Sequence, residues 1–305
     1  GRLNKDMPFY ILLHGLNGGS DEEYVKEFVM RQTRRGSTVA VMIARGLMGT
    51  PVIGNQVFHG ARVSDIHQVT KIIKQQLLEG HLVVGVGYSM GGIIIANYVA
   101  RYGESCQFDA AVAVSGGLDM REQINFHRSM RLWQPMLAQS LRDTIMKGAR
   151  QKYEERLSEK QFLELLRASH VKGIDEHAVV TYNGYDNIMH YYSDMSAMGD
   201  YYSSNQTGRI SNVSIPLCII HALDDPLITW RAAVGPDKPE NVVKSGKGYL
   251  LVLLTKSGGH VGWPLGINPK NYGWKWMHGA VEGFVDAFMH VSRKSSASDY
   301  MSTNN

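Results

Sequence analysis

Short apolar runs alternate with amphipathic stretches along most of this chain, and this alternation restricts its fold more than any other feature. Most of the runs are continuous rather than alternately apolar and polar, as expected of strands that are covered on both faces. Strands of this kind, connected by helices, form a parallel sheet between two helical layers. The expected strands are residues 8–14, 37–44, 82–87, 110–115, 216–221 and 249–255.

The stretches between these runs predict the helices and the division of the chain. Helical spacing places helices at residues 22–35, 63–78, 91–102 and 274–291. The alternation stops between residues 118 and 213, where two further helical stretches, at 128–148 and 158–171, precede a Tyr- and Met-rich segment. We therefore expect a helical cap (residues 118–213) inserted into one α/β core (residues 1–117 and 214–291), followed by a disordered, Ser-rich tail (residues 292–305).

Composition excludes several classes of function. The net charge is +4, and no block of Lys and Arg is interleaved with aromatic residues, so we expect no nucleic-acid partner. The two cysteines, Cys106 and Cys218, form no CxxC pair and no zinc-type spacing with His, so no metal site is expected.

The chain also has no apolar stretch near the roughly 20 residues that a membrane span needs. It begins with Gly1 rather than Met, so we expect a fragment whose upstream part could carry a membrane anchor. Nothing requires an oxidising compartment, and we expect an intracellular or membrane-associated protein rather than a secreted one.

A G-x-S-x-G sequence, formed by Gly87, Ser89 and Gly91, follows one expected strand and precedes a helix. A sharp turn at this place pushes the serine hydroxyl above the edge of the sheet, and small flanking residues let the backbone bend that tightly. The helix N-terminus behind Ser89 offers N–H groups to a developing anion. The alternative is a Gly-rich turn without chemistry, but the strand and helix around it favour a nucleophile.

The loop after the first strand, HGLNGG at residues 14–19, is the expected oxyanion hole. Two backbone N–H groups stabilise the oxyanion in this arrangement, and we assign them to Leu16 and to Met90, the residue after the nucleophile. Gly15 and the later glycines let backbone approach a substrate. The alternative, a phosphate-binding loop, is disfavoured because the chain lacks GxGxxG and a P-loop lysine.

A serine hydroxyl needs an imidazole to take its proton and a carboxylate to orient that imidazole. His260, in SGGHVGW, follows the last strand, and ALDDP follows the strand before it. Both Asp224 and Asp225 are candidates for the acid. We prefer Asp225, which precedes Pro226, although both carboxylates could simply shape a turn. The resulting order, Ser, Asp, His, is the one that this kind of sheet uses.

The motifs HGLNGG, GYSMGG, ALDDP and SGGHVGW, in this order, resemble those of the YheT-like branch of the α/β-hydrolases. That branch includes bacterial esterases, mammalian lipases and phospholipases, and yeast ethyl-ester synthases. The resemblance covers about residues 8–289 and includes Arg45-Gly46 and, in the insertion, residues 174–177, 184–185 and 191–192. Carried over by position, the acid falls on Asp225 and the base on His260. The Asn usual before Arg45 is here Ala44.

The resemblance implies an α/β-hydrolase fold and a serine carboxylic ester hydrolase, a carboxylesterase or lipase, that needs no metal or organic cofactor. The Met-rich insertion suits an adaptable apolar pocket, so we expect medium- or long-chain acyl esters such as monoacylglycerols as substrates. Two alternatives stay open: an acyltransferase that makes esters from small alcohols, and a non-catalytic binding protein of the same fold. The sequence does not indicate an oligomeric state.

Overall fold

The computed structural model describes residues 3–124, 126, 131–200, 208–235, 237–265 and 273–302, with side chains in the last helix up to residue 294. Within these residues one sheet has six strands, all parallel, in the order β2-β1-β3-β4-β5-β6. Each strand matches its prediction to within two residues. The strands are β1 (Phe9–Leu13), β2 (Thr38–Met42), β3 (Val83–Tyr88), β4 (Ala110–Val114), β5 (Leu217–Ala222) and β6 (Leu250–Thr255).

The strand order reverses beside β1, and this reversal sets the position of the site. The chain moves outward from β1 to β2, then returns to the other side of β1 for β3 and continues to β6. The loops after β1 and β3 therefore leave the sheet in opposite directions. In open parallel sheets, ligands bind in the crevice that forms at such a switch point, outside the carboxyl ends of the strands.

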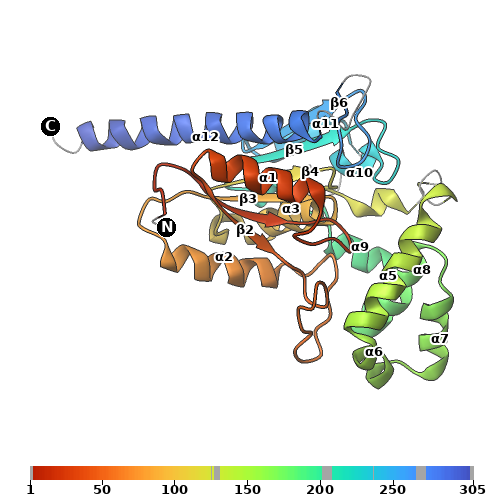
Figure 1. The fold of residues 1–305 in the computed structure, drawn as a ribbon. Coiled ribbons are helices and arrows are strands. Elements are labelled where there is room, and N and C mark those ends of the chain that lie inside the picture. Colours follow the sequence, from red (N-terminus) through yellow and green to blue (C-terminus); the bar gives the residue numbers. More distant parts are fainter. Residues whose placement is uncertain are drawn as a thin grey trace.

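Helices cover both faces of the sheet, as the continuous apolar runs predicted. Figure 1 shows α1 (Glu23–Arg34) and α12 (Lys275–Ser302) over one face and α2 (Ser64–Gln76) and α3 (Met90–Tyr102) over the other. The three helices predicted at 22–35, 63–78 and 91–102 are confirmed to within two residues at each end. α11 (Pro239–Ser245) packs against β6.

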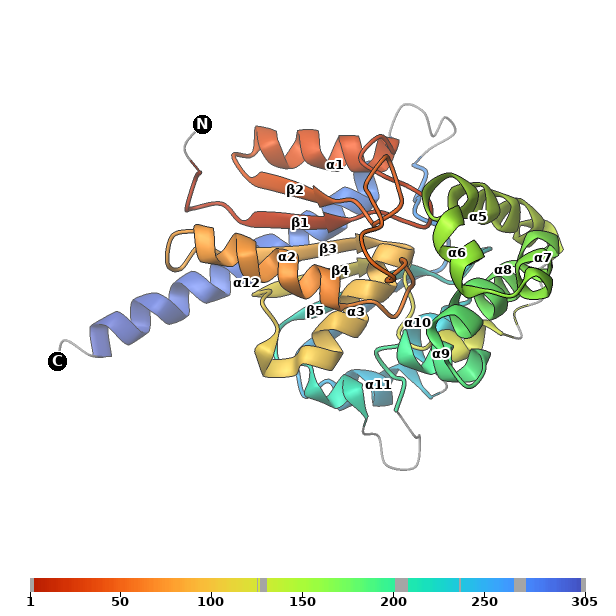
Figure 2. The ribbon, with the colours of Figure 1, turned by 90° about the horizontal axis from the view of Figure 1, so that it is seen from below.

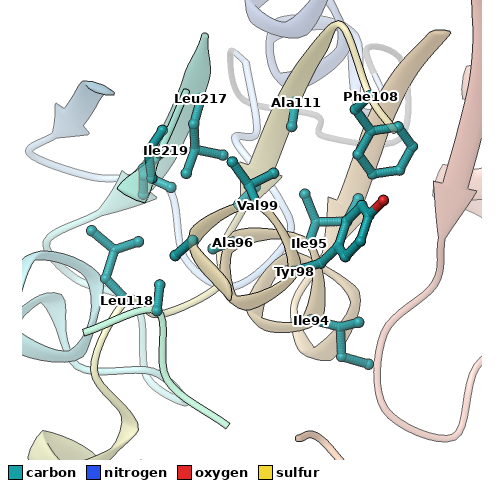
Figure 3. Packing of buried hydrophobic residues seen from close by; sticks show 14 of the residues in the cluster. Ile94, Ile95, Ala96, Tyr98, Val99, Phe108, Ala111, Leu118, Leu217 and Ile219 are labelled. Atoms are coloured by element: carbon teal, nitrogen blue, oxygen red, sulfur yellow. The ribbon is translucent and has the colours of Figure 1, made fainter. Parts of the chain in front are cut away.

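The two faces of β1 enter two separate hydrophobic layers. Tyr10 and Leu12 pack with Phe28 of α1 and with α12, whereas Ile11 and Leu13 pack with α3. Figure 3 shows the second layer, in which Ile95, Val99 and other α3 side chains lie against small and branched residues of β4 and β5. α3 is buried along almost its whole length, so the helix that follows Ser89 is fixed from every side.

The chain segment that connects β4 to β5 forms a group of helices, and this group lies to one side of the sheet in Figures 1 and 2. Its core contains Ala138, Tyr153, Leu157, Leu165 and Tyr182, separate from the two layers of the sheet. The cap boundaries at 118–213 stay an interpretation of this arrangement, and residues 125, 127–130 and 201–207 lie outside the described part. The elements are η2 (Met120–Gln123), α5 (Gln134–Gly148), α6 (Arg150–Arg156), α7 (Glu159–Arg167), α8 (Val171–Ile174), the π-helix η3 (Asp175–Thr181), α9 (Ile188–Asp194) and η4 (Arg209–Asn212).

The last helix is longer than the sequence predicted. We expected a helix at 274–291 and a disordered tail from 292, but α12 continues to Ser302 and extends past the sheet in Figure 1. Nothing between residues 284 and 302 stops a helix, because that stretch contains neither Gly nor Pro. Residues 303–305 lie outside the described part. No helix in the described residues combines the length and the apolar character needed to cross a membrane.

We expect Leu12→Ala to lower the free energy of unfolding by about 2–5 kcal/mol, because the variant leaves a cavity in the layer beneath α1 and α12. The Leu12 side chain is 0% exposed. A urea titration followed by circular dichroism measures the change. The matched control is Ile53→Ala, whose side chain is 80% exposed and whose loss should change stability by no more than about 0.5 kcal/mol. Equal losses in both variants would contradict the described core.

Candidate active site

Ser89 occupies a strained turn between β3 and α3. Its backbone has φ 53° and ψ −118°, a combination that residues other than glycine rarely adopt. Two hydrogen bonds hold it there: Ser89 N–H donates to Val114 O (2.8 Å), and Ile93 N–H donates to Ser89 O (3.1 Å). The sequence predicted this turn, and the structure places the Ser89 side chain at the carboxyl edge of the sheet, at the switch point beside β1.

Two glycines make the turn sterically feasible. A Cβ added at Gly87 would lie 2.2 Å from the carbonyl oxygen of Gly91, and one added at Gly91 would lie 2.4 Å from the carbonyl oxygen of Leu13. Because each atom that they would meet is backbone, neither clash could be relieved by a side-chain movement. The G-x-S-x-G spacing therefore reflects the close approach of β3, α3 and the end of β1.

The structure brings Ser89, His260 and Asp225 together from three distant parts of the chain. His260 Nε2 lies 2.8 Å from Ser89 Oγ, and His260 Nδ1 lies 2.8 Å from Asp225 Oδ2. The Asp225 side chain is fully buried, and its other oxygen, Oδ1, accepts hydrogen bonds from Leu227 N–H and Ile228 N–H. Both carboxylate oxygens are thus engaged, and the acid has little freedom to turn away from the imidazole.

Asp224, the other candidate for the acid, has a different contact. Its Oδ1 accepts a hydrogen bond from Gly259 N–H at 3.0 Å and therefore ties the loop that carries His260 to the loop after β5. The sequence left the choice between the two acids open apart from pattern resemblance. In the structure the His260 imidazole is paired with Asp225, whereas Asp224 contacts the backbone of Gly259, the residue before His260.

The His260 loop is braced from the other side by two residues that the sequence analysis did not single out. Val261 N–H donates to Ser115 Oγ (3.0 Å), and Trp274 Nε1–H donates to Val261 O (2.9 Å). Val261 itself has φ 49°, which is unfavourable for a β-branched residue. Ser115 directly follows β4 at the carboxyl edge of the sheet, a position that could have marked it as part of the site.

Leu16 and Met90, the predicted oxyanion donors, both line the cavity that contains Ser89. Met90 is the first residue of α3, where backbone N–H groups have no partner within the helix. Within the described part of the chain, neither the Leu16 nor the Met90 N–H donates to a protein acceptor. Both groups are therefore free for an anionic oxygen beside Ser89.

Tyr24, to which no sequence motif pointed, positions the loop that carries Leu16. Gly15 N–H donates to Tyr24 Oη at 2.8 Å, so this N–H is already used and cannot serve as the oxyanion donor. A Cβ added at Gly15 would lie 3.4 Å from the Cβ of Ser89, which shows how closely the loop approaches Ser89. Burial raises the pKa of Tyr24 to about 12, so its hydroxyl stays protonated at neutral pH.

His14 fixes the start of the same loop in its neutral form. Burial lowers the pKa of His14, and its two ring nitrogens have complementary partners. Nδ1 lies 2.7 Å from Gly15 O, which can only accept, so Nδ1 carries the hydrogen. Nε2 then accepts from Ala44 N–H at 3.3 Å. The resemblance predicts Asn at the position of Ala44, and here it is the backbone N–H of this residue that contacts the loop.

The cavity at Ser89 has a volume of about 280 Å³. The helices that connect β4 to β5 in the sequence supply part of its lining. Its walls are mainly aliphatic and thioether side chains, with a few polar groups at fixed places. A cavity of this kind suits an ester with an apolar substituent. The apolar walls include Met90, Ile93, Met120, Ile124, Leu137, Val171, Met195, Leu227 and Ile228, and the polar ones include Gln123, Gln134, Lys172, Asp175 and Tyr192.

A family model described as alpha/beta hydrolase fold matches residues 10–246, more than half of the chain. The chain belongs to this family. Its relatives include the monoacylglycerol lipase of Saccharomyces cerevisiae, 29% identical over 271 residues that cover 86% of this chain and 56% of the yeast protein. They also include YheT of Escherichia coli, 27% identical over 259 residues that cover 84% of this chain and 70% of the bacterial protein. The predicted likeness to the YheT-like branch is therefore confirmed.

A solved structure shows the same fold. Est1E from Butyrivibrio proteoclasticus with bound ferulic acid aligns with a TM-score of 0.55 and 14% identity, covering 94% of this chain and 91% of Est1E. The predicted α/β-hydrolase fold is thus confirmed. This chain spans 55% to 63% of the length of three of the curated relatives that it matches.

We expect Asp225→Asn to slow the labelling of Ser89 by a fluorophosphonate probe by up to about 10⁴-fold, because an amide would hold the imidazole in the wrong tautomer. Asp224→Asn keeps an oxygen that can accept from Gly259 N–H, and it should label at close to the rate of the unaltered protein. The measurement is the second-order labelling rate, with thermal unfolding as a check of the fold. Equal slowing in both variants would show that the acid has been assigned wrongly.

Proposed function

We propose that this chain is a serine carboxylic ester hydrolase that cleaves medium- or long-chain acyl esters, such as monoacylglycerols, through an acyl-enzyme. The observation that carries the proposal is the pair of 2.8 Å contacts that join Ser89 Oγ to His260 Nε2 and His260 Nδ1 to Asp225 Oδ2. This is the geometry that a hydroxyl needs in order to lose its proton as it attacks a carbonyl carbon.

In the first step Ser89 Oγ forms a bond to the ester carbonyl carbon while His260 Nε2 takes the hydroxyl proton. The carbonyl oxygen becomes an anion that the Leu16 and Met90 N–H groups stabilise. The carbon–oxygen bond to the alcohol then breaks, and the alcohol oxygen receives the proton from His260. The acyl group stays on Ser89 as an ester, and Asp225 stabilises the imidazolium while it exists.

In the second step a water molecule takes the place of the alcohol. His260 removes a proton from the water as its oxygen attacks the acyl carbon, and the same two N–H groups stabilise the second oxyanion. Collapse of this intermediate breaks the bond to Ser89 Oγ, and His260 returns the proton to Ser89. The products are a carboxylic acid and the regenerated serine, so the cycle uses only water and groups of this chain.

The preference for a long acyl chain rests on the walls of the cavity. Met90, Met120 and Met195 line it together with branched aliphatic side chains, and flexible thioethers adapt to chains of different shape. Burial of each methylene in such a wall contributes about 0.8 kcal/mol to binding. The yeast relative's name, monoacylglycerol lipase, is in keeping with this preference. Association with a membrane stays an expectation.

We expect Ser89→Ala to abolish fluorophosphonate labelling and to reduce hydrolysis of p-nitrophenyl butanoate and octanoate by at least about 10³-fold, since the variant removes the hydroxyl that contacts His260 Nε2. The unaltered protein should hydrolyse octanoate with a higher kcat/KM than acetate. Full esterase activity in Ser89→Ala would end the proposal, and a sharp preference for acetate would end its lipid part.

The two alternatives from the sequence are separated in the same assay. With ethanol or glycerol added, chromatography of the products shows whether the acyl group passes to water or to the alcohol. A dominant ester product at low alcohol concentration would favour an acyltransferase, because the catalytic groups are the same and only the acceptor differs. A binding protein without turnover would give neither product.

A further inference from the structure

A second cavity, of about 90 Å³, lies beside the catalytic one and shares four of its lining residues. The shared residues are Leu16, Met90, Val171 and Asp175, which we call the doorway residues. Ser89 and His260 line only the catalytic cavity. The remaining walls come from the loop after β2 and from the cap helices, and they include Val52, Val57, Phe58, Leu141, Ile145, Tyr153, Ile174, Ala178 and Val179.

One face of α5 runs along both cavities. Residues that line them recur at spacings of three, four and seven, the period of a single helical stripe. The stripe begins at the catalytic cavity and ends at the second, so α5 forms one continuous wall for a molecule that extends from one into the other. Its members are Gln134 and Leu137 at the catalytic cavity and Leu141, Thr144, Ile145 and Gly148 at the second.

The chemistry of the reaction decides which half of an ester would enter the second cavity. His260 must protonate the departing alcohol oxygen, so the alcohol half lies on the His260 side of Ser89. The second cavity is lined by Leu16 and Met90, which carry the two oxyanion donors, whereas neither His260 nor Ser89 lines it. The substituent that points away from His260 in the acyl-enzyme is the acyl chain.

We propose that the far end of the substrate's acyl chain passes between the doorway residues into the second cavity, which thereby sets the preferred chain length. This inference rests on the proposed esterase function and adds to it the location of the acyl subsite. The second cavity has an apolar wall made largely of cap residues, and each methylene that reaches this wall adds an apolar contact. A short acyl chain ends in the catalytic cavity and makes none of these contacts.

Asp175 gives the doorway a polar group. Its Oδ2 accepts a hydrogen bond from Tyr192 Oη at 2.9 Å, and burial raises the pKa of this carboxyl to about 7. Near neutral pH the group therefore changes between a neutral acid and a carboxylate. A methylene chain that passes beside the carboxylate strips it of any remaining water, which opposes entry, whereas the neutral acid opposes entry much less.

The other titratable and charged groups around Asp175 do not duplicate this behaviour. Glu176 raises the pKa of Asp175, and its own carboxylate pairs with Lys172 Nζ at 3.6 Å. Tyr153, Tyr191 and Tyr192 have their pKa values raised by burial and stay neutral. Two further groups line the second cavity: Arg45, which is paired with Asp65, and His59, whose pKa is lowered by burial to about 3.

Variants of the α5 stripe test the acyl subsite. Thr144→Phe fills the second cavity, and we expect it to lower the ratio of kcat/KM for octanoate to that for butanoate, as p-nitrophenyl esters, by at least about tenfold. Ile145→Ala enlarges the same cavity and should raise the ratio of dodecanoate to octanoate. Met146→Phe is the matched control, because Met146 lies on α5 but lines neither cavity, and it should leave both ratios unchanged.

A second series holds the acyl group at butanoyl and varies the alcohol from methyl to octyl. Thr144→Phe and Ile145→Ala should not change the dependence of kcat/KM on the length of the alcohol. If the two variants changed only this dependence, the second cavity would bind the alcohol, and its assignment to the acyl chain would be overturned. Equal losses on butanoate and octanoate in Thr144→Phe, or no change in either α5 variant, would also overturn it. Failure of the unaltered protein to hydrolyse any of these esters would instead refute the proposed function.

The titration of Asp175 gives an independent test. Because the neutral fraction of a group with a pKa of about 7 falls about tenfold between pH 6 and pH 8, the octanoate-to-butanoate ratio should fall by up to that factor. Both esters compete in one tube, and chromatography of the released acids gives the ratio, in which any effect of pH on the catalytic steps that both esters share cancels. In Asp175→Asn the ratio should not depend on pH. A ratio that depends on pH equally in both proteins would contradict the role of Asp175.

Discussion

The close approach of three backbone segments at the Ser89 turn is the constraint on which the rest of the site depends. β1 and β3 are neighbours in register, with Leu13 opposite Gly87, and α3 begins directly behind both. The contact is tight enough that no side chain fits at Gly87 or Gly91. It places the start of α3, the hydroxyl and the loop after β1 within a few ångströms of one another. Since α3 is buried among β1, β3 and β4, the strain at Ser89 is held by the core of the sheet rather than by the site itself.

Because of this arrangement, the sheet positions the reacting groups, whereas the inserted helices shape the cavities. The reacting groups all sit on loops at the carboxyl edge of the sheet, where their positions are fixed by strands that pair along their whole length. About half of the residues that line the two cavities come from the helices that connect β4 to β5 in the sequence, and these helices have a hydrophobic core of their own. Changes in the cap can therefore reshape what is bound without disturbing Ser89, His260 or Asp225. This separation is a general property of sites grafted onto stable folds.

The sequence was sufficient for the sheet because its strands are covered on both faces and read as continuous apolar runs. It also placed Ser89, Asp225 and His260 at the ends of the correct strands, since chain order and strand order are linked in a parallel sheet. It did not point to Tyr24, whose role is a single hydrogen bond to the backbone N–H of Gly15. Ser115 was overlooked although it directly follows β4, because its partner, Val261 N–H, lies 146 residues further along the chain. The extension of α12 was missed because polar composition was taken as disorder where no residue stops a helix. The second cavity has no sequence signal at all, since it exists only where α5, η3 and the loop after β2 meet.

The histidines around the nucleophile show how the fold restricts where positive charge can form. His14 lies at the start of the oxyanion loop, and His221 lies 3.9 Å from Asp225 Oδ2, with its Nε2 donating to Ile228 O. Burial lowers the pKa of both rings, so each stays neutral and acts only as a hydrogen-bonding spacer. A charged ring at either place would alter the field at the reacting atoms: beside Asp225 it would compete for the carboxylate that must stabilise His260. With both rings neutral, the imidazolium of the proposed acyl transfer would develop on His260, between the departing oxygen and the buried Asp225.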